Sequence, residues 1–485
     1  MESWIIVLIC MIAYLAFALT LGLLAGYKRK ASISEYVVAE RNISLVVMWF
    51  LMGGTIFSAF AFLGGPGWAY SKGAASFYIL SYCALGMLPW YFFGPKVSRI
   101  GEKFSHVTEG DLLKGRYKSN LLPVLIALVA TIAFIQYICL QLKGVAYTVN
   151  ILTGGHIPFW AGALIAYGVV VIYVITSGVR GAAWSDVVQG GLMLIIAWVV
   201  GLYLVYHLYG GPTAMFQQIA ATNPGHLIIG KEGSHMGIVA FSTATLVSII
   251  GFMMWPHLFM KTYTTNIKTM KRTVMMYPLF AIFLVPVLFI GFSGMMQVSS
   301  GELAAADQIL PTMVHMLKFS PLLIGIIGAG TLAASMSSAD AITHGAASTF
   351  VEDVVRVINP KMSEKSVLWT LRIMVLVIGA ISYYLAIFGS ASLVALLLGG
   401  YGFIVQIAPP VYGAVYWKRA TKGGAISGFV VGALLNSYFA YSGAASPAGI
   451  NPGIVGLIGN IIVFVVVSLL TKPQDMEHVN KFVEA

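Results

Sequence analysis

The chain has 485 residues, of which 59% are hydrophobic and only 9% carry a charge. Because soluble globular proteins contain about 25% charged residues, this composition excludes a soluble enzyme and indicates an all-α polytopic membrane protein. The net charge of +11 does not indicate nucleic acid as a partner. The basic residues lie in short loops between apolar stretches, where they report membrane topology.

Thirteen apolar stretches are predicted to cross the lipid bilayer as helices. They lie near residues 4–27, 45–70, 74–94, 121–149, 158–178, 186–209, 236–258, 274–297, 321–350, 366–388, 392–416, 423–443 and 453–471. Basic residues 28–30 follow the first stretch and none precedes it, which is the reverse of the charge order in a signal peptide. We therefore expect a first transmembrane helix with its N-terminus outside.

The distribution of Lys and Arg tests this topology. With the N-terminus outside, 24 of the 28 Lys and Arg residues, Lys261 among them, fall on inner segments. The positive-inside rule then favours thirteen spans in the cytoplasmic membrane, with a cytoplasmic C-terminus. Lys143, in the fourth span, is interpreted as a residue whose long side chain reaches the outer interface.

Two spans are interrupted by glycine and proline, which lower the cost of unwinding a helix. The second span contains GG at 53–54 and GGPG at 64–67, and the seventh contains Gly251 and Pro256. Interrupted helices at corresponding positions of two halves are typical of a transporter whose binding site lies at the membrane midplane. The alternative is that these residues only allow helices to pack closely.

The interrupted spans predict two inverted five-helix repeats, at about 45–209 and 236–416, within a single transmembrane domain that covers 1–485. The other segments are a first extra helix and inner loop (1–44), two C-terminal extra helices (423–471) and a cytoplasmic tail (472–485).

The ninth span has an unusual polar face. Ala334, Ser337, Ser338 and Ala341 share one side of the helix at i, i+3, i+4 and i+7, and Asp340 lies on its flank. Such a face is costly in lipid, so we expect it to point into the protein. Adjacent hydroxyls together with carbonyls of an unwound helix can supply the oxygen ligands of a small hard cation. The alternative is that the serines only bond their own helix backbone.

Two carboxylates lie within predicted spans, Asp186 at the start of the sixth and Asp340 in the ninth. Acidic residues in a membrane helix predict an ion or proton site. For Asp186 the alternatives are capping of its helix and pairing with Arg180. For Asp340 the alternative is a buried hydrogen bond.

His257 follows Pro256 in the second interrupted helix. Its position is equally consistent with contact with a substrate and with a structural role. An aromatic cluster that includes Phe57 and Phe60 surrounds the first interruption, and packing or a substrate wall would both explain it. The spans contain no nucleophile–base or metal-ligand constellation, so a membrane enzyme is not predicted. The tail after Leu470 is too short for a signalling domain, which argues against a sensor.

Three motifs resemble the sodium:solute symporter family: FSAFAFLGGPGWAYSKG at 57–73, SGVRGAAWSDVVQGG at 177–191 and LAASMSSADAITHGAASTFVEDV at 332–354. They are spread over both predicted repeats, so the resemblance covers essentially the whole chain. It implies an inverted five-plus-five helix repeat of the amino acid-polyamine-organocation type, shared with the neurotransmitter-sodium symporters, and Na⁺ as the coupling ion.

In that family a sodium ion lies between the first broken helix and the helix that carries the hydroxyl pair. The resemblance implies hydroxyl ligands and backbone carbonyl ligands from Ser337, Ser338, Ala334, Gly54 and Phe57. Some members bind a second sodium ion near the acidic residue that matches Asp186. Here the matching hydroxyl positions hold Asp340 and Ala341, which leaves a second ion, a proton site or a structural pair of carboxylates open.

The segments SAFAFLGGPGWAY and WPHLF are together most similar to the pantothenate and monocarboxylate permease branch. This similarity implies a small organic anion as cargo, contacted by Ser58, Phe60, Trp255 and His257. The proline-transporter branch has an acidic residue where this chain has Ile56, which argues against proline.

The predicted function is therefore sodium-coupled symport of a small organic solute, a carboxylate such as a monocarboxylate or pantothenate, by alternating access. One alternative is a proton-coupled carrier of the same fold that uses Asp340 or Asp186, and another is sodium symport of an amino acid or other solute. The implied partners are the solute, sodium and the lipid bilayer. The sequence does not predict an oligomeric state.

Overall fold

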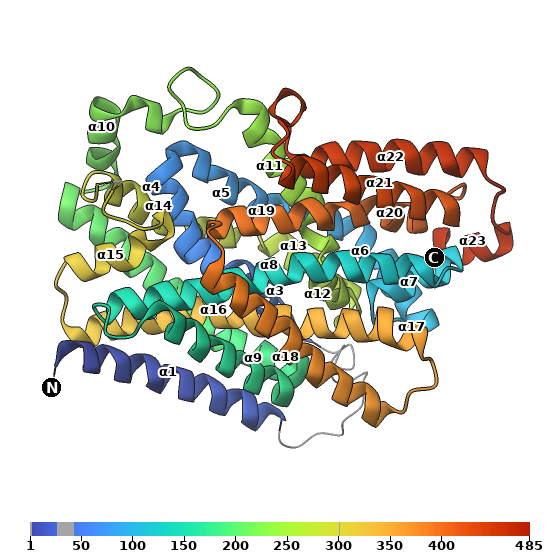
Figure 1. Cartoon of the computed structure of the whole chain (residues 1–485), viewed down its shortest axis with the longest axis horizontal. Coiled ribbons are helices and arrows are strands. Elements are labelled where there is room, and N and C mark those ends of the chain that lie inside the picture. The colour runs from blue at the N-terminus through green and yellow to red at the C-terminus, as the bar shows by residue number, and fades with distance from the viewer. Residues whose placement is uncertain (1, 27–42, 300) are drawn as a thin grey trace.

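The computed structural model describes residues 2–26, 43–299 and 301–485, which form a single bundle of helices (Figure 1). The basic residues 28–30 and Arg41, which were used to predict the topology, lie outside the described residues. Most long helices run along the long axis of the molecule in Figure 1. The first helix, α1, lies at one edge of this view, and the last two long helices, α21 and α22, lie side by side at the other.

The helices up to the end of the first predicted repeat are α1 (Ser3–Gly26), α3 (Leu45–Ile56), a π-helix (Phe60–Gly64), α4 (Gly65–Lys72), a 3₁₀-helix (Gly73–Phe77), α5 (Tyr78–Leu85), α6 (Leu88–Phe104), α7 (Glu109–Tyr117), α8 (Leu121–Leu152) and α9 (Phe159–Tyr209). The connection to the second repeat contains α10 (Pro212–Thr222) and a 3₁₀-helix (Pro224–Leu227).

The second predicted repeat contains α11 (Ile238–Gly251), a 3₁₀-helix (Phe252–Met254), α12 (Pro256–Phe259), a 3₁₀-helix (Met260–Tyr263), α13 (Ile267–Met276), α14 (Leu279–Met295), a 3₁₀-helix (Ala306–Gln308), α15 (Ile309–Met316), α16 (Pro321–Phe350), a π-helix (Val351–Val355), α17 (Arg356–Ile358), α18 (Glu364–Phe388), α19 (Leu393–Ile404), a 3₁₀-helix (Val405–Ile407) and α20 (Ala408–Tyr416). The chain ends with α21 (Lys422–Tyr441), a 3₁₀-helix (Pro447–Gly449), α22 (Pro452–Leu470) and α23 (Met476–Val483).

The described residues contain ten helices that are long and apolar enough to cross a membrane, and the bent pair Ile238–Met254 and Pro256–Tyr263 makes an eleventh. Two shorter apolar helices, Leu45–Gly54 and Phe159–Ile172, lie in the remaining predicted stretches. The all-helical, multi-span architecture is confirmed. The number of thirteen spans is not confirmed by helix length and composition.

The two predicted spans at 158–178 and 186–209 are joined in the structure. Both belong to α9, a continuous helix of 51 residues, of which Asp186–Tyr209 is long and apolar enough to span. The connecting residues 179–185, VRGAAWS, contain no proline to stop a helix. The side chains of residues 176–185, including Arg180, lie outside the described part.

The first predicted interruption is present, but it lies between the two glycine motifs and not at either of them. Helical angles end at Phe57, with φ −72° and ψ 60°, and the chain continues through Ser58 into the π-helix. The GGPG motif lies inside α4, with Pro66 in the first turn, where its missing N–H costs nothing. Gly53 packs on α14, because a Cβ there would stand 1.9 Å from the Phe280 ring. Close packing, the alternative interpretation, explains this glycine.

The second predicted interruption lies where Pro256 predicts it. The helix axis bends by 53° between Met254 and Pro256. At the bend Trp255 has extended angles, φ −63° and ψ 122°, which the residue before a proline prefers.

Helix α16 contains the predicted polar face and is packed among α1, α8, α9 and α18 (Figure 1). Over its most apolar stretch 83% of the residues are buried, compared with 28% in α1. The polar face therefore points into the protein, as its cost in lipid predicts.

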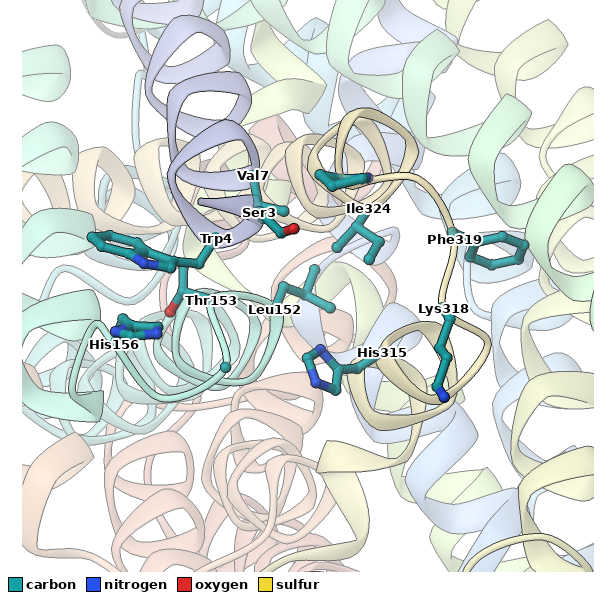
Figure 2. Close-up of a pocket in the computed structure, with 12 residues that line it drawn as sticks. Ser3, Trp4, Val7, Leu152, Thr153, His156, His315, Lys318, Phe319 and Ile324 are labelled. Atoms are coloured by element: carbon teal, nitrogen blue, oxygen red, sulfur yellow. The ribbon is translucent and has the colours of Figure 1, made fainter. Parts of the chain in front are cut away.

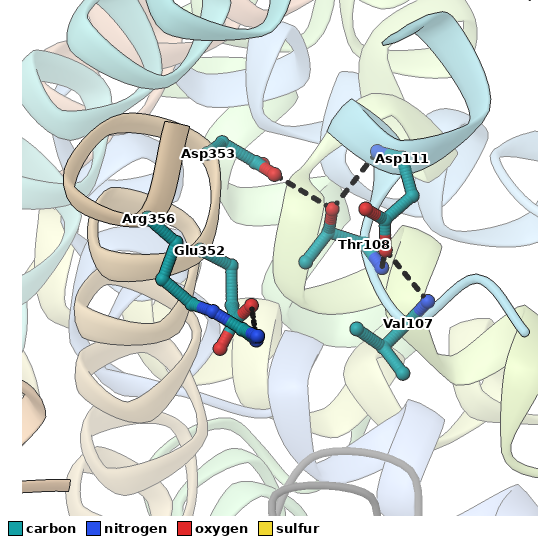
Figure 3. A network of polar contacts seen from close by, with 6 residues as sticks. All are labelled: Val107, Thr108, Asp111, Glu352, Asp353 and Arg356. Atoms are coloured by element: carbon teal, nitrogen blue, oxygen red, sulfur yellow. Dashed lines mark hydrogen bonds and ion pairs between the residues drawn. The ribbon is translucent and has the colours of Figure 1, made fainter. Parts of the chain in front are cut away.

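Beyond the end of α16, a polar network joins the helix to the short helix α7 (Figure 3). The Thr108 hydroxyl donates to the Asp353 carboxylate at 2.7 Å and accepts from the N–H of Asp111 at 3.0 Å. The neighbouring Glu109 is buried, and no hydrogen bond reaches its carboxylate oxygens from the described residues. Burial and the nearby charge of Asp353 raise the pKa of Glu109 well above its usual range.

The tail packs back onto the bundle through α23. His478 bonds the carbonyls of residues 115 and 116 at the end of α7, and the Phe482 ring stacks on Phe104 of α6. The tail thereby covers α7, the helix that the polar network ties to α16, and the end of α6.

Candidate functional site

The first interruption leaves backbone amides without helical partners, and polar side chains bond them. The side chain of Ser58 accepts from the N–H of Phe60 at 3.1 Å, and its carbonyl accepts from the N–H groups of Ala61 and Phe62. The N–H of Ala59 donates to the side-chain oxygen of Gln141 in α8 at 3.1 Å. Ser58, predicted to contact substrate, thus caps the second half of the broken helix. Sequence reasoning missed Gln141, although a polar residue in the middle of an apolar span was a visible signal.

Both serines of the polar face contact the first broken helix. The hydroxyls of Ser337 and Ser338 donate to the carbonyl of Gly54, at 3.3 and 2.8 Å. The Ser337 hydroxyl also lies 3.2 Å from the Ala334 carbonyl. Four of the five predicted sodium ligands are therefore together, and the fifth, Phe57, lies at the break itself.

The spacing of these oxygens suits a small cation. With metal–oxygen distances of about 2.4 Å in an octahedron, neighbouring ligand oxygens lie about 3.4 Å apart. The Ser337 hydroxyl lies 3.3 and 3.2 Å from the Gly54 and Ala334 carbonyls, close to this value, whereas the 2.8 Å between the Ser338 hydroxyl and the Gly54 carbonyl is a hydrogen-bond distance. Both hydroxyls bond a different helix, so bonding to their own backbone alone does not explain them.

The two predicted acidic residues are buried next to this cluster. Asp186 lies inside α9, so it does not cap the start of a helix. Its carboxylate carbon lies 3.5 Å from the point where a Cβ on Gly54 would stand, and no hydrogen bond from the described residues reaches its oxygens. Asp340 is 4% exposed, accepts from the N–H of Ala341, and lies within electrostatic range of Asp186.

A third charged residue, Lys261, lies with them and was not predicted. It follows the second bend and was assigned to an inner loop, but it is only 5% exposed. Its ammonium donates to the carbonyl of Leu51, one turn before Gly54, at 2.9 Å. The charges of Asp186 and Asp340 both act on it. Its position four residues, about one helical turn, after His257 could have indicated that it is buried near the second interruption. The positive-inside rule instead assigned it to a loop.

The second interruption is enclosed by aromatic rings. The Trp255 ring lies 5.6 Å from Phe134, 5.1 Å from Tyr137 and 5.7 Å from Tyr401. His257 packs on the same Phe134 and Tyr137 rings, and its Cβ lies 2.3 Å from where a Cβ on Gly345 of α16 would stand. Gly345 is seven residues, about two turns, beyond Ser338.

A chain of rings connects the two interruptions. Phe60 contacts Tyr82 at 6.0 Å between ring centroids, Tyr82 contacts Tyr401 at 5.9 Å, and Tyr401 contacts Trp255. The structure thus places Phe60, Trp255 and His257, the remaining predicted substrate residues, along one buried wall.

Some polar atoms on this wall have no hydrogen-bond partner among the described residues. They include both ring nitrogens of His257 and the hydroxyl of Tyr82. The hydroxyls of Tyr78, whose ring stacks on Tyr82, and of Tyr277, whose ring contacts Phe252 next to Tyr82, are unpaired as well. Buried polar atoms are nearly always hydrogen-bonded, so unpaired atoms in such a cluster mark a place where a ligand or water binds. None was recognised as such from the sequence except His257.

Two features lie away from these residues. A cavity of about 350 Å³ opens where α1, α8 and α16 begin or end, with Trp4, His156 and His315 in its lining (Figure 2). None of the predicted ion or substrate residues lines it. Lys143, expected to reach the interface, is 3% exposed and instead donates to the carbonyls of Gly389 and Ala391 at the end of α18.

Comparison with known proteins matches residues 36–432 to the model of the sodium:solute symporter family. An uncharacterized symporter, YhjB of Bacillus subtilis, is 34% identical over 96% of this chain and 97% of its own length. A monocarboxylate transport permease of Rhizobium johnstonii is 27% identical (95% and 96% covered), and the osmoregulated proline transporter of B. subtilis is 26% identical (92% and 91%). A substrate-bound, outward-open Na⁺-coupled sialic acid symporter has the same fold, with a TM-score of 0.79 at 20% identity, covering 97% of this chain and 98% of that one.

Proposed function

Because the chain belongs to the sodium:solute symporter family, and is therefore a sodium-coupled transporter of a small organic solute and not an enzyme, we propose that its cargo is a small carboxylate. Na⁺ is the coupling ion. The proposal concerns where the ion binds, where the cargo binds and what the cargo is.

The ion is proposed to bind between α16 and the first interruption, held by the hydroxyls of Ser337 and Ser338 and by carbonyls of Ala334, Gly54 and Phe57. The observation that carries this proposal is that both serine hydroxyls converge on one carbonyl of another helix. A cation placed there would replace hydrogen bonds between the helices with stronger ion–oxygen contacts. It would therefore hold α16 against α3.

The cargo is proposed to bind along the aromatic wall between the two interruptions. His257 lies there with two unpaired ring nitrogens, and the Tyr78 and Tyr277 hydroxyls are also unpaired. Hydrogen-bond donors in an otherwise apolar, buried wall suit a small carboxylate with an apolar remainder. The monocarboxylate relative supports this class, and the proline relative at similar identity makes an amino acid the second candidate.

Coupling would follow from the shared helix. The proposed ion site and the His257 contact at Gly345 are both on α16, about two turns apart. If sodium favours the position of α16 that completes the cargo wall, each ligand raises the affinity for the other by the same factor.

Uptake into proteoliposomes tests the proposal. Labelled pyruvate, lactate, acetate, pantothenate, proline and a sugar would each be offered with an inward sodium gradient, with potassium in its place, and with an inward proton gradient. We expect sodium-driven uptake of one carboxylate. Sodium-driven uptake of proline or the sugar alone would refute the proposal that the cargo is a carboxylate. Proton-driven uptake in the absence of sodium would refute sodium as the coupling ion.

A further inference from the structure

Lys261 joins the two broken helices. It belongs to the 3₁₀-helix that follows the second bend, is 5% exposed, and its ammonium donates to the Leu51 carbonyl in α3 at 2.9 Å. A lysine is almost never buried without anionic partners. Its location one turn from Gly54 places it next to the proposed sodium site.

The anionic partners are the carboxylates of two other helices. Asp186 of α9 packs against Gly54, within 3.5 Å of where a Cβ would stand there. Asp340 of α16 lies two residues after Ser338. Both carboxylates are buried, and both act electrostatically on Lys261 and on each other. Four helical segments, α3, α9, α16 and the one after α12, thus bring one ammonium and two carboxylates together.

The two carboxylates resemble the anionic ligands of a cation site, but the cation next to them is the side chain of Lys261. Two buried carboxylates next to each other repel and require a positive charge between them. A mobile sodium ion could supply that charge, but here a side chain already does. A second cation entering the same space would have to approach the ammonium at short range.

We propose that the ammonium of Lys261 occupies the place of a second cation between Asp186 and Asp340, so that the protein binds a single sodium ion per chain. The remaining ion binds at the serine pair, and this part rests on the proposed function. The tethered ammonium sets the number of ions per transport cycle and holds α3, α9 and α16 together when the mobile ion has left.

Equilibrium binding of ²²Na⁺ to the purified full-length protein in detergent tests this without knowledge of the cargo. We expect one saturable Na⁺ per wild-type chain. Lys261→Met leaves the two carboxylates without their cation, and the number should rise to two. Adding both Asp186→Asn and Asp340→Asn to Lys261→Met removes the charges that attract the second ion and should return the number to one.

Two further variants guard against loss of the fold. Lys261→Gln combined with Asp340→Asn keeps the net charge of the cluster and should still bind two ions, because Asp186 has lost its ammonium. Lys143→Met removes another buried lysine, whose bonds go to carbonyls of residues 389 and 391, and should bind one ion as the wild type does.

Two bound ions in the wild type, or a single ion in the folded, charge-balanced Lys261→Gln/Asp340→Asn variant, would overturn the proposal. The serine site is judged separately. If Ser337→Ala/Ser338→Ala keeps its Na⁺ ion, the proposed function fails at the ion site, while the difference between the wild type and the lysine variants still decides the role of Lys261.

Discussion

The two interrupted helices occupy corresponding positions in the predicted repeats, yet their surroundings differ in chemistry. Around the first, at Phe57, lie hydroxyls, carbonyls, carboxylates and an ammonium. Around the second, at Trp255, lie aromatic rings and one histidine. The same interruption of a helix is therefore surrounded by polar and charged groups in one repeat and by aromatic rings in the other. We propose that the oxygen atoms at the first break suit a cation and that the largely apolar wall at the second, with its few polar atoms, suits an organic anion.

The largest effect is expected at the first break. Ser337→Ala/Ser338→Ala removes both hydroxyls that reach Gly54, and Na⁺ affinity should fall about 100-fold or more, because two ligands are lost at about 1.5–3 kcal/mol each. The measurement is the Na⁺ concentration for half-maximal uptake. The control is Ser335→Ala on the same helix, whose hydroxyl bonds only the Thr331 carbonyl and whose loss should leave Na⁺ affinity nearly unchanged. If Ser335→Ala lowered the Na⁺ affinity as much as the double variant, the serine pair would not be the ion site.

The second break is tested through the cargo. His257→Phe keeps a ring in the aromatic wall but removes the two unpaired nitrogens. Carboxylate affinity should fall about 10- to 100-fold, the usual cost of losing a hydrogen bond to a charged group, while ²²Na⁺ binding stays close to that of the wild type. His156→Phe, where the ring stacks on Trp4 at 4.5 Å, is the matched control and should alter neither. If His257→Phe also lost Na⁺ binding, the ion and the cargo would not bind separately at the two breaks.

A smaller effect is expected from the side chain that supports the first break. Gln141→Leu leaves the N–H of Ala59 without its partner, which should cost about 1–3 kcal/mol. A lower melting temperature in detergent and slower uptake should result. Gln136→Leu lies on the same helix and loses only a bond to the Tyr441 hydroxyl at a more exposed site, so it should be near neutral. Equal melting temperatures for the two variants would contradict the supporting role.

An effect of similar size, confined to neutral pH, concerns a turn outside the breaks. Asp307 is buried and accepts from the N–H of Leu393 at the start of α19, and burial raises its pKa to about 6. A pKa above the usual value means that the folded protein favours the protonated form. The contribution of Asp307 to stability is therefore largest below about pH 4 and declines as the pH rises to about 6.

Asp307→Asn can still accept from Leu393 but cannot ionise. We expect it to be more stable than the wild type at pH 7.5 by about 1–3 kcal/mol, with the difference vanishing near pH 4. Thermal unfolding in detergent at the two pH values measures this. If the difference in stability between the two proteins were the same at both pH values, the raised pKa of Asp307 would be refuted.

The sequence predicted those features that depend on a local pattern. The serine face of α16 followed from helical periodicity, and the second bend followed from the proline after Trp255. The first break was predicted in the right helix but at the glycines, because a glycine that unwinds a helix and a glycine that admits a neighbouring ring look alike in sequence. Gly53 is of the second kind.

The features that were missed depend on contacts between distant segments. Lys261 was counted as a loop residue because topology rules weigh charge, not burial, and its partners are 75 and 79 residues away. The continuous helix α9 was predicted as two spans, although the residues between them contain no proline that would end a helix. The ring chain from Phe60 to Trp255 joins both repeats and has no local signature.

The π-helix at Phe60–Gly64 makes the first break sensitive to the number of residues in the chain. A π turn accommodates one residue more than an α turn without forming a loop. Deleting one residue there would restore an α turn and rotate Phe57 and Ser58 by about 100° relative to α4. A single insertion or deletion at this point would therefore exchange the whole set of side chains that faces the first break. In this chain the side chains that face the first break therefore depend on the number of residues in the π turn as well as on their identity.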